Sequence, residues 1–216
     1  MLGQVPRGKI DDEHPKDWRH RCPSRSCLLH PGFSIFIIFL DPPSHLDPVR
    51  SVEYLIANET LILSAMTLIY IVAALVLLVL VLALHDRLKT VQPRLMALAT
   101  PLGIIWAGIV IASGLISVSG SQTVIGLHAV DPERAGTVWL AVGIMQNALG
   151  GGIELVGGVW ILLVSVSAMA GKTLSRFLNY LGVILGLVGI ASVVPALSDL
   201  VDVFGLGQIV WFFGSG

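Results

Sequence analysis

Hydrophobic residues in this chain of 216 residues are grouped into long uncharged stretches, which short polar segments separate. The clearest stretch runs for 24 residues from Leu61 to Leu84. As a helix it would be roughly 36 Å long, at about 1.5 Å per residue, which is enough to cross a hydrocarbon core of ~30 Å. A helix in water needs a polar face, and this stretch has none. The pattern therefore predicts a helix that spans a membrane.

The other apolar stretches extend this prediction to an all-α, polytopic transmembrane helical bundle with five to six spans. Residues 1–27 are polar and are expected to form a disordered cytoplasmic tail, followed by a membrane domain over 28–216. The expected spans are 28–40 (short), 61–84, 95–118, 137–170, 177–197 and 203–216 (clipped).

The segments between these spans have their own local signals. A short amphipathic helix is predicted around Pro48 to Ala57, and Pro93 is suited to the first turn of a helix. Residues 119–135 are polar and are predicted to form a loop. The stretch 137–170 is too long for one upright span, so its Gly150-Gly151-Gly152 run predicts a kink or break, and a hinge.

Composition and motifs exclude several classes of protein. Hydrophobic residues make up 55% of the chain and charged residues 12%, about half the charged share of a soluble domain. No basic stripe interleaved with aromatic residues indicates nucleic-acid binding. Cys22 and Cys27 are too few for a disulfide framework, and with His20 and His30 they do not match a common zinc spacing. No catalytic motif is present, so no metal and no cofactor are predicted, and an intramembrane enzyme is the least favoured of the functional alternatives.

The basic residues alternate along the chain in a way that predicts orientation. Six Lys and Arg lie in the tail, three in 85–94 and two in 171–176, whereas 41–60 and 119–135 have one each. Lys and Arg in short loops favour the cytoplasmic side of a membrane. We therefore expect both termini to be cytoplasmic, which requires 28–40 to cross the membrane.

Glycines at helical spacing predict close contact between helices. Gly182, Gly186 and Gly189 follow one face of the stretch 177–197. Lipid gives helices no hydrophobic reason to associate, so small residues that allow close backbone approach supply the contact. We expect these three glycines to pack against another helix, either within the chain or in a second copy.

Glu154 is the one ionisable residue deep inside an apolar stretch. A charged carboxylate in the membrane costs at least about 2.5 kcal/mol, so it should face the bundle interior. Helical spacing places Asn147 and Ser165 on the same face, which predicts a polar stripe. The stripe either lines a ligand or transport path, or it is structural, with the Glu154 carboxyl bonded to Ser113, Ser117 or Tyr70.

The C-terminal half resembles a known family. The segment GGIELVGGVWILLVSVSAMAGKTLSRFLNYLGVILGLVGIASVVP has a glycine-bearing span, a short basic loop and Leu-Gly-x-x-x-Gly, and a final apolar stretch with Trp211 follows it. These features are similar to a bacterial, mostly actinobacterial, integral-membrane family catalogued as domain of unknown function number 4386. The resemblance implies six membrane helices in a bacterial cytoplasmic membrane, and it implies no activity.

Two functional hypotheses follow from these observations. The first is a small transporter or channel-like protein with Glu154 and Asn147 in its polar path. The second is a non-catalytic scaffold or subunit of a larger membrane complex. The expected partners are the lipid bilayer and either a second copy or other membrane proteins.

Overall fold

A computed structural model describes residues 47–215, and this part of the chain is a bundle of helices without a strand. The predicted tail, the predicted span 28–40 and Gly216 lie outside the described residues. The helices, in chain order, are α2 Pro48–Ala57, α3 Glu59–Met66, the π-helix η3 Thr67–Val72, α4 Ala73–Leu88, α5 Pro93–His128, α6 Pro132–Gly171, α7 Arg176–Ala191, the 3-10 turn η4 Pro195–Leu197 and α8 Leu200–Ser215.

Three helical segments are long and apolar enough to cross a membrane. They are Glu59–Leu88, which joins α3, η3 and α4, then α5 and α6, with 30, 36 and 40 residues. The prediction of an all-α membrane bundle is thereby confirmed. α7 and α8 are apolar but have only 16 residues each. The number of spans beyond the three long ones stays a prediction.

Local signals account for several helix ends, and α2 and α5 begin as predicted. α2 covers the predicted residues, and the Arg50 amide donates to Asp47 Oδ1 over 2.9 Å as an N-terminal cap. Pro93 opens α5. α6 ends where Lys172 adopts a left-handed conformation with φ 52°. Ser175 then caps α7 by accepting from the Leu178 amide.

The predicted loop over 119–135 is wrong for most of its length. α5 continues to His128, so the connection to α6 consists of three residues, 129–131. Ser121 and Val124 are fully buried, and Gly120 lies against Val142 of α6. This contact with α6 favours the helix over the loop that the polar composition suggested.

The predicted break within α6 is also absent, because the helix is continuous through Gly150, Gly151 and Gly152. Glycine inside a helix costs about 1 kcal/mol relative to alanine. The turns of α6 on both sides of the glycines pack against α5. Val142 lies against Gly120, and Gly157 lies against the Trp106 ring. That packing outweighs the propensity of the glycines. Whether these three residues act as a hinge stays a prediction.

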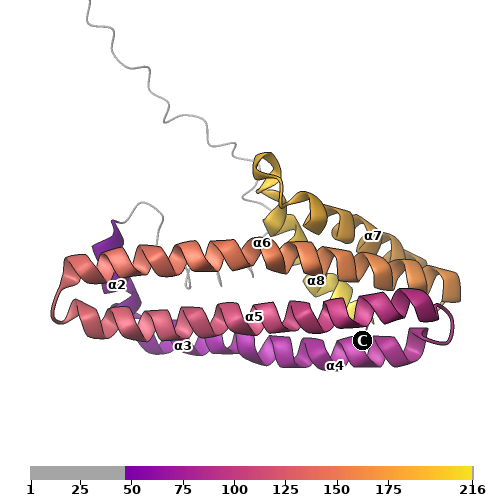
Figure 1. Cartoon of the computed structure of the whole chain (residues 1–216), viewed down its shortest axis with the longest axis horizontal. Helices are drawn as coiled ribbons and strands as arrows, with labels where there is room; N and C mark the ends of the chain where they lie inside the picture. Colours follow the sequence, from indigo (N-terminus) through magenta and orange to yellow (C-terminus); the bar gives the residue numbers. More distant parts are fainter. Residues whose placement is uncertain (1–46, 216) are drawn as a thin grey trace, which may run out of the picture.

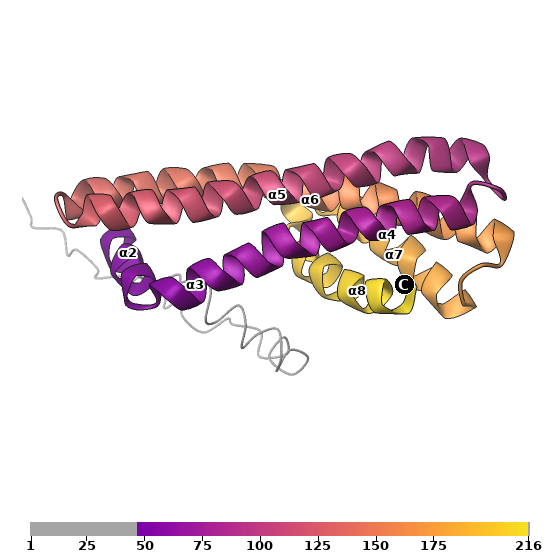
Figure 2. The ribbon, with the colours of Figure 1, turned by 90° about the horizontal axis from the view of Figure 1, so that it is seen from below.

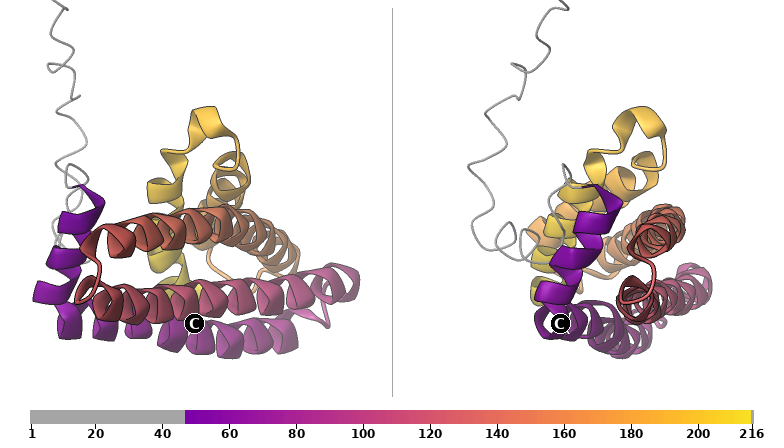
Figure 3. Two further views of the ribbon diagram at one scale, coloured as in Figure 1. Left: turned by 60° about the vertical axis from the view of Figure 1, so that its left-hand side comes forward. Right: turned by 90° about the vertical axis from the view of Figure 1, so that its left-hand side faces the viewer.

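The long helices lie side by side along one axis, and α2 crosses one end of them (Figures 1 and 2). α7 and α8 form a hairpin that accompanies only about half of α6, and its tip stands away from the long helices (Figures 1 and 3). The connections 89–92 and 172–175 meet at the end remote from α2, where the Arg87 side chain donates to the Thr173 carbonyl over 3.3 Å. We call this the basic end, defined by Arg87, Lys89, Arg94, Lys172 and Arg176.

An aromatic cluster forms the core where α5, α6 and α8 meet. Trp106 and Trp160 have ring centroids 5.6 Å apart, and Trp160 contacts Trp211 edge-on at 5.8 Å. Phe204 and Phe212 of α8 complete the cluster around Trp106. Such aromatic pairs add about 0.5–1.5 kcal/mol each beyond the area that they bury. The cluster therefore ties the hairpin to α5 and α6.

Candidate functional site: the polar face of α6

Glu154 lies near the middle of α6 and is half-buried. Its Oε2 atom is buried without a hydrogen-bond partner among the described residues. Gly150, one turn earlier, leaves the space beside this oxygen without a side chain. Ser117, one of the three partners expected for the Glu154 carboxyl, donates instead to Met66 Sδ over 3.1 Å.

Ser165 lies on the same face of α6, but in a different environment. It is fully buried against Gly182 of α7, and its Oγ has no hydrogen-bond partner among the described residues. The Trp211 indole is the other neighbour of Gly182, and its N–H donates to the Leu178 carbonyl over 3.1 Å. Ser165 is therefore part of a contact between three helices.

The three predicted packing glycines lie in this contact, within the chain. A methyl group on Gly158 of α6 would come within 2.8 Å of the Gly186 carbonyl oxygen, and one on Gly189 within 2.7 Å of the Glu154 carbonyl oxygen. Real side-chain carbons do not approach so closely, so the backbones of α6 and α7 are in contact. We call the contact of residues 154–165 with Gly182, Gly186 and Gly189 the glycine seam.

Asn147 is not part of this seam, although it shares the face. It is exposed, and a side chain on the neighbouring Gly143 would meet nothing within 4 Å. α7 ends opposite Glu154, and α2 covers the face again only at Gly136, where Val49 approaches. The predicted stripe therefore has an uncovered part at Asn147, an intermediate position at Glu154 and a closed part at Ser165.

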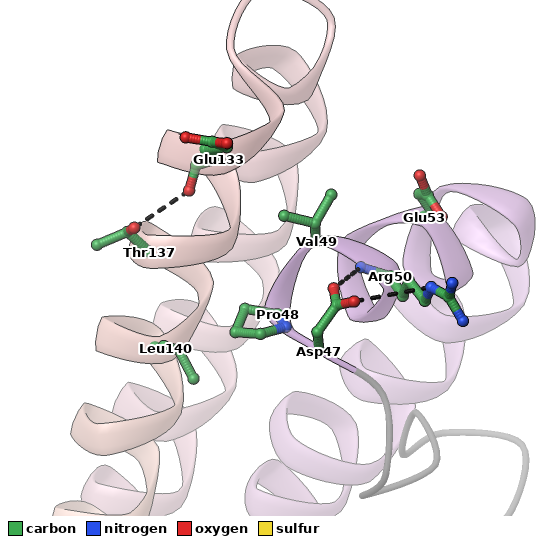
Figure 4. Close-up of a pocket in the computed structure, with 8 residues that line it drawn as sticks. All are labelled: Asp47, Pro48, Val49, Arg50, Glu53, Glu133, Thr137 and Leu140. Carbon is green, nitrogen blue, oxygen red and sulfur yellow. Dashed lines mark hydrogen bonds and ion pairs between the residues drawn. The ribbon is translucent and has the colours of Figure 1, made fainter.

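A pocket of about 550 Å³ lies at the α2 end of the same face (Figure 4). Its charged groups are Asp47, Arg50, Glu53 and Glu133, and Leu140 continues its wall toward Asn147. Asp47 Oδ2 lies 3.7 Å from Arg50 Nε, so the Arg50 guanidinium is already paired. No sequence signal predicts this pocket, because α2 and α6 are far apart in the chain.

The reciprocal tryptophans were also missed. Gly103-x-x-Trp106 in α5 and Gly157-x-x-Trp160 in α6 have the same spacing, which is a signal that the sequence does contain. In the structure each indole lies over the glycine of the other helix. Among the described residues, no group of three His, Cys, Asp or Glu is placed to hold a metal ion.

These features define the class of protein: an all-α bundle whose long apolar helices make it a membrane protein. Comparisons with models of protein families, with curated proteins and with solved structures found no match to this chain. The resemblance to domain of unknown function number 4386 therefore stays a prediction.

Proposed function

We propose that this chain is a multi-pass protein of a bacterial cytoplasmic membrane that acts as a non-catalytic scaffold or subunit of a larger membrane complex. The observation that carries the proposal is the glycine seam. A methyl group does not fit between Gly158 and Gly186, and Ser165 fills the space at Gly182. The backbones of α6 and α7 are in direct contact there, so the seam holds the two helices together and leaves no open path between them.

The uncovered part of α6 is the surface that a partner would use. Leu140, Ile144 and Met145 are 54%, 69% and 55% exposed, next to the exposed Asn147. A contiguous apolar patch beside a hydrogen-bonding group is typical of a protein–protein contact. The amide of Asn147 both donates and accepts, so it fits another polar helix or a second copy of itself.

The test is the size of the native complex in gently solubilised membranes, measured by blue-native electrophoresis. Ile144→Asp should release the chain from its complex, because a carboxylate at the contact would lose its water. Val130→Asp is the matched control, since Val130 is 84% exposed and lies in the connection between α5 and α6. A wild-type chain that migrates alone, or an Ile144→Asp complex of unchanged size, would contradict the proposal.

A small transporter or channel-like protein is the second candidate. The observation in its favour is the buried Glu154 Oε2 without a partner, because an intramembrane ionisable group often marks a transport path. On this hypothesis Glu154→Gln abolishes proton- or substrate-coupled flux in a folded protein. On the scaffold hypothesis the same variant keeps the complex intact.

The proposed orientation places the basic end in the cytoplasm, as the distribution of Lys and Arg favours. All five residues that define the basic end lie in or beside the connections 89–92 and 172–175. α8 returns toward this end, since Gly214 contacts Leu178 near the start of α7. The C-terminus is then cytoplasmic, and a cytoplasmic N-terminus still requires 28–40 to cross.

A further inference from the structure

The lengths of the helices do not match a single bilayer. α5 and α6 have 36 and 40 residues, so they are roughly 54 and 60 Å long at 1.5 Å per residue. A hydrocarbon core is only about 30 Å thick. A tilt large enough to hide 60 Å would exceed the usual range of 0–40°. Part of each long helix must therefore lie outside the hydrocarbon core.

The outward-facing side chains change character along the helices. On Glu59–Leu88 the exposed residues from Leu68 to Ala83 are all apolar. The exposed residues before them are mostly polar: Glu59, Thr60, Ser64 and Thr67, with Leu61 as the apolar exception. On α5 the exposed residues from Ala97 to Leu115 are apolar or proline, and Ser119, Gln122 and Thr123 are exposed beyond them. The apolar part of α5 has 19 residues, which is about 28 Å.

On Glu59–Leu88 and on α5 these changes occur at the same level. Ser117 of α5 contacts Met66 at the end of α3, which places the two boundaries beside each other. On the hairpin, Gly189 contacts Glu154, and the exposed Asp199 and Asp202 follow near the tip. On α6 the exposed Asn147 lies within about two turns of Glu154, but the exposed Leu140, Ile144 and Met145 beyond it are apolar and belong to the proposed partner contact. The basic end lies at the opposite end of these apolar stretches.

We infer that the bilayer surrounds only the half of the bundle next to the basic end. There α4, the first half of α5, the second half of α6, and the hairpin α7–α8 all cross the core. The other half, formed by α2, α3 and the adjoining parts of α5 and α6, projects by about 15–20 Å into the opposite aqueous compartment. The interaction surface is the belt of apolar side chains between Leu68 and Ala83 and between Ala97 and Leu115, and its partner is the lipid hydrocarbon.

The charge at the hairpin tip supports this placement over one centred on Leu61 to Leu84. If the hydrocarbon core were centred on that stretch, the hairpin tip would lie near the middle of the core. Asp199 would then face lipid. A carboxylate there costs at least about 2.5 kcal/mol. With the core placed next to the basic end, Asp199 reaches the aqueous boundary and needs no partner. The 16-residue helices then suffice to cross, together with Ser192 to Leu197.

The test is labelling of single cysteines with a membrane-impermeant maleimide, using the purified protein in sealed proteoliposomes so that no partner covers it. The background is Cys22→Ser with Cys27→Ser. Ile144→Cys and Val79→Cys are a matched pair, because both residues are 69% exposed in the protein and only the bilayer distinguishes them. Gln122→Cys and Ser198→Cys report on α5 and on the hairpin tip, and Thr90→Cys reports on the basic end.

We expect label at Ile144, Gln122, Ser198 and Thr90, each in the fraction of molecules that face outward, and none at Val79. Full labelling of every variant in denaturing detergent shows that the thiols react. Protection of Ile144 and Gln122 to the level of Val79 would overturn the inference, because the bilayer would then cover the projecting half. Label at Gln122 with protection at Ser198 would also overturn it, since the hairpin would end inside the core.

Discussion

The indole of Trp106 lies directly over Gly157, and a methyl group on that glycine would overlap the ring. Trp160 occupies the same position over Gly103, with its Nε1 atom 2.6 Å from where a Cβ would be. The two helices therefore exchange tryptophans through a repeated Gly-x-x-Trp spacing. The packing of both indoles at the centre of the bundle therefore requires glycine at positions 103 and 157.

Gly157→Ala should destabilise the bundle by about 1–3 kcal/mol, because overpacking forces the Trp106 ring to move. The matched control is Gly108→Ala on α5, where nothing lies within 4 Å of the new methyl group. Alanine is the better helix former by about 1 kcal/mol, so the control should be neutral or slightly stabilising. Thermal unfolding in detergent micelles measures both. Equal unfolding midpoints for the two variants would contradict the contact.

Gly182→Ala should separate α6 from α7, because the new methyl group would overlap the Ser165 hydroxyl. The double variant Gly182→Ala with Ser165→Gly should recover part of the loss, since the removed side chain restores the space. The expected coupling between the two changes is about 0.5–3 kcal/mol, as for residues in contact. A double variant whose loss is the sum of the two single losses would show that the residues do not meet.

Glu154→Gln should unfold within about 0.5 kcal/mol of the wild-type protein, as the amide has the same shape as the carboxyl group and Oε2 makes no hydrogen bond to a described residue. Glu154→Leu keeps a similar volume and removes the polar group, so it separates a requirement for polarity from a requirement for shape. Chemical denaturation of the purified protein compares the three. A marked loss of stability in Glu154→Gln alone would indicate an essential ionised carboxylate.

Asp47→Ala should loosen α2 by about 1 kcal/mol, because the Arg50 amide loses the side chain that caps the helix. Glu53→Ala is the control, since Glu53 is exposed in the middle of the same helix. Hydrogen exchange of the α2 amides reports the difference. Equal exchange rates in the two variants would mean that Asp47 contributes no cap.

The candidate site was only partly predictable. Helical periodicity placed Asn147, Glu154 and Ser165 on one face, and glycine spacing selected the face of α7 that packs. Neither signal showed that Ser165 would meet Gly182 while Asn147 stayed exposed. That difference depends on where α7 ends along α6, which is set by contacts between residues 17 to 35 positions apart.

The sequence by itself determined that the chain forms apolar helices, because an uncharged stretch of this length has no polar face to present to water. It also determined several helix ends, since Asp47, Pro93 and Ser175 act within a few residues of themselves. Only the tertiary structure decided that α5 continues to His128, that α6 stays unbroken at its glycines, and that the polar stripe is closed at Ser165 but open at Asn147. Packing between distant segments outweighs local preferences of about 1 kcal/mol per residue, and no single segment contains that information.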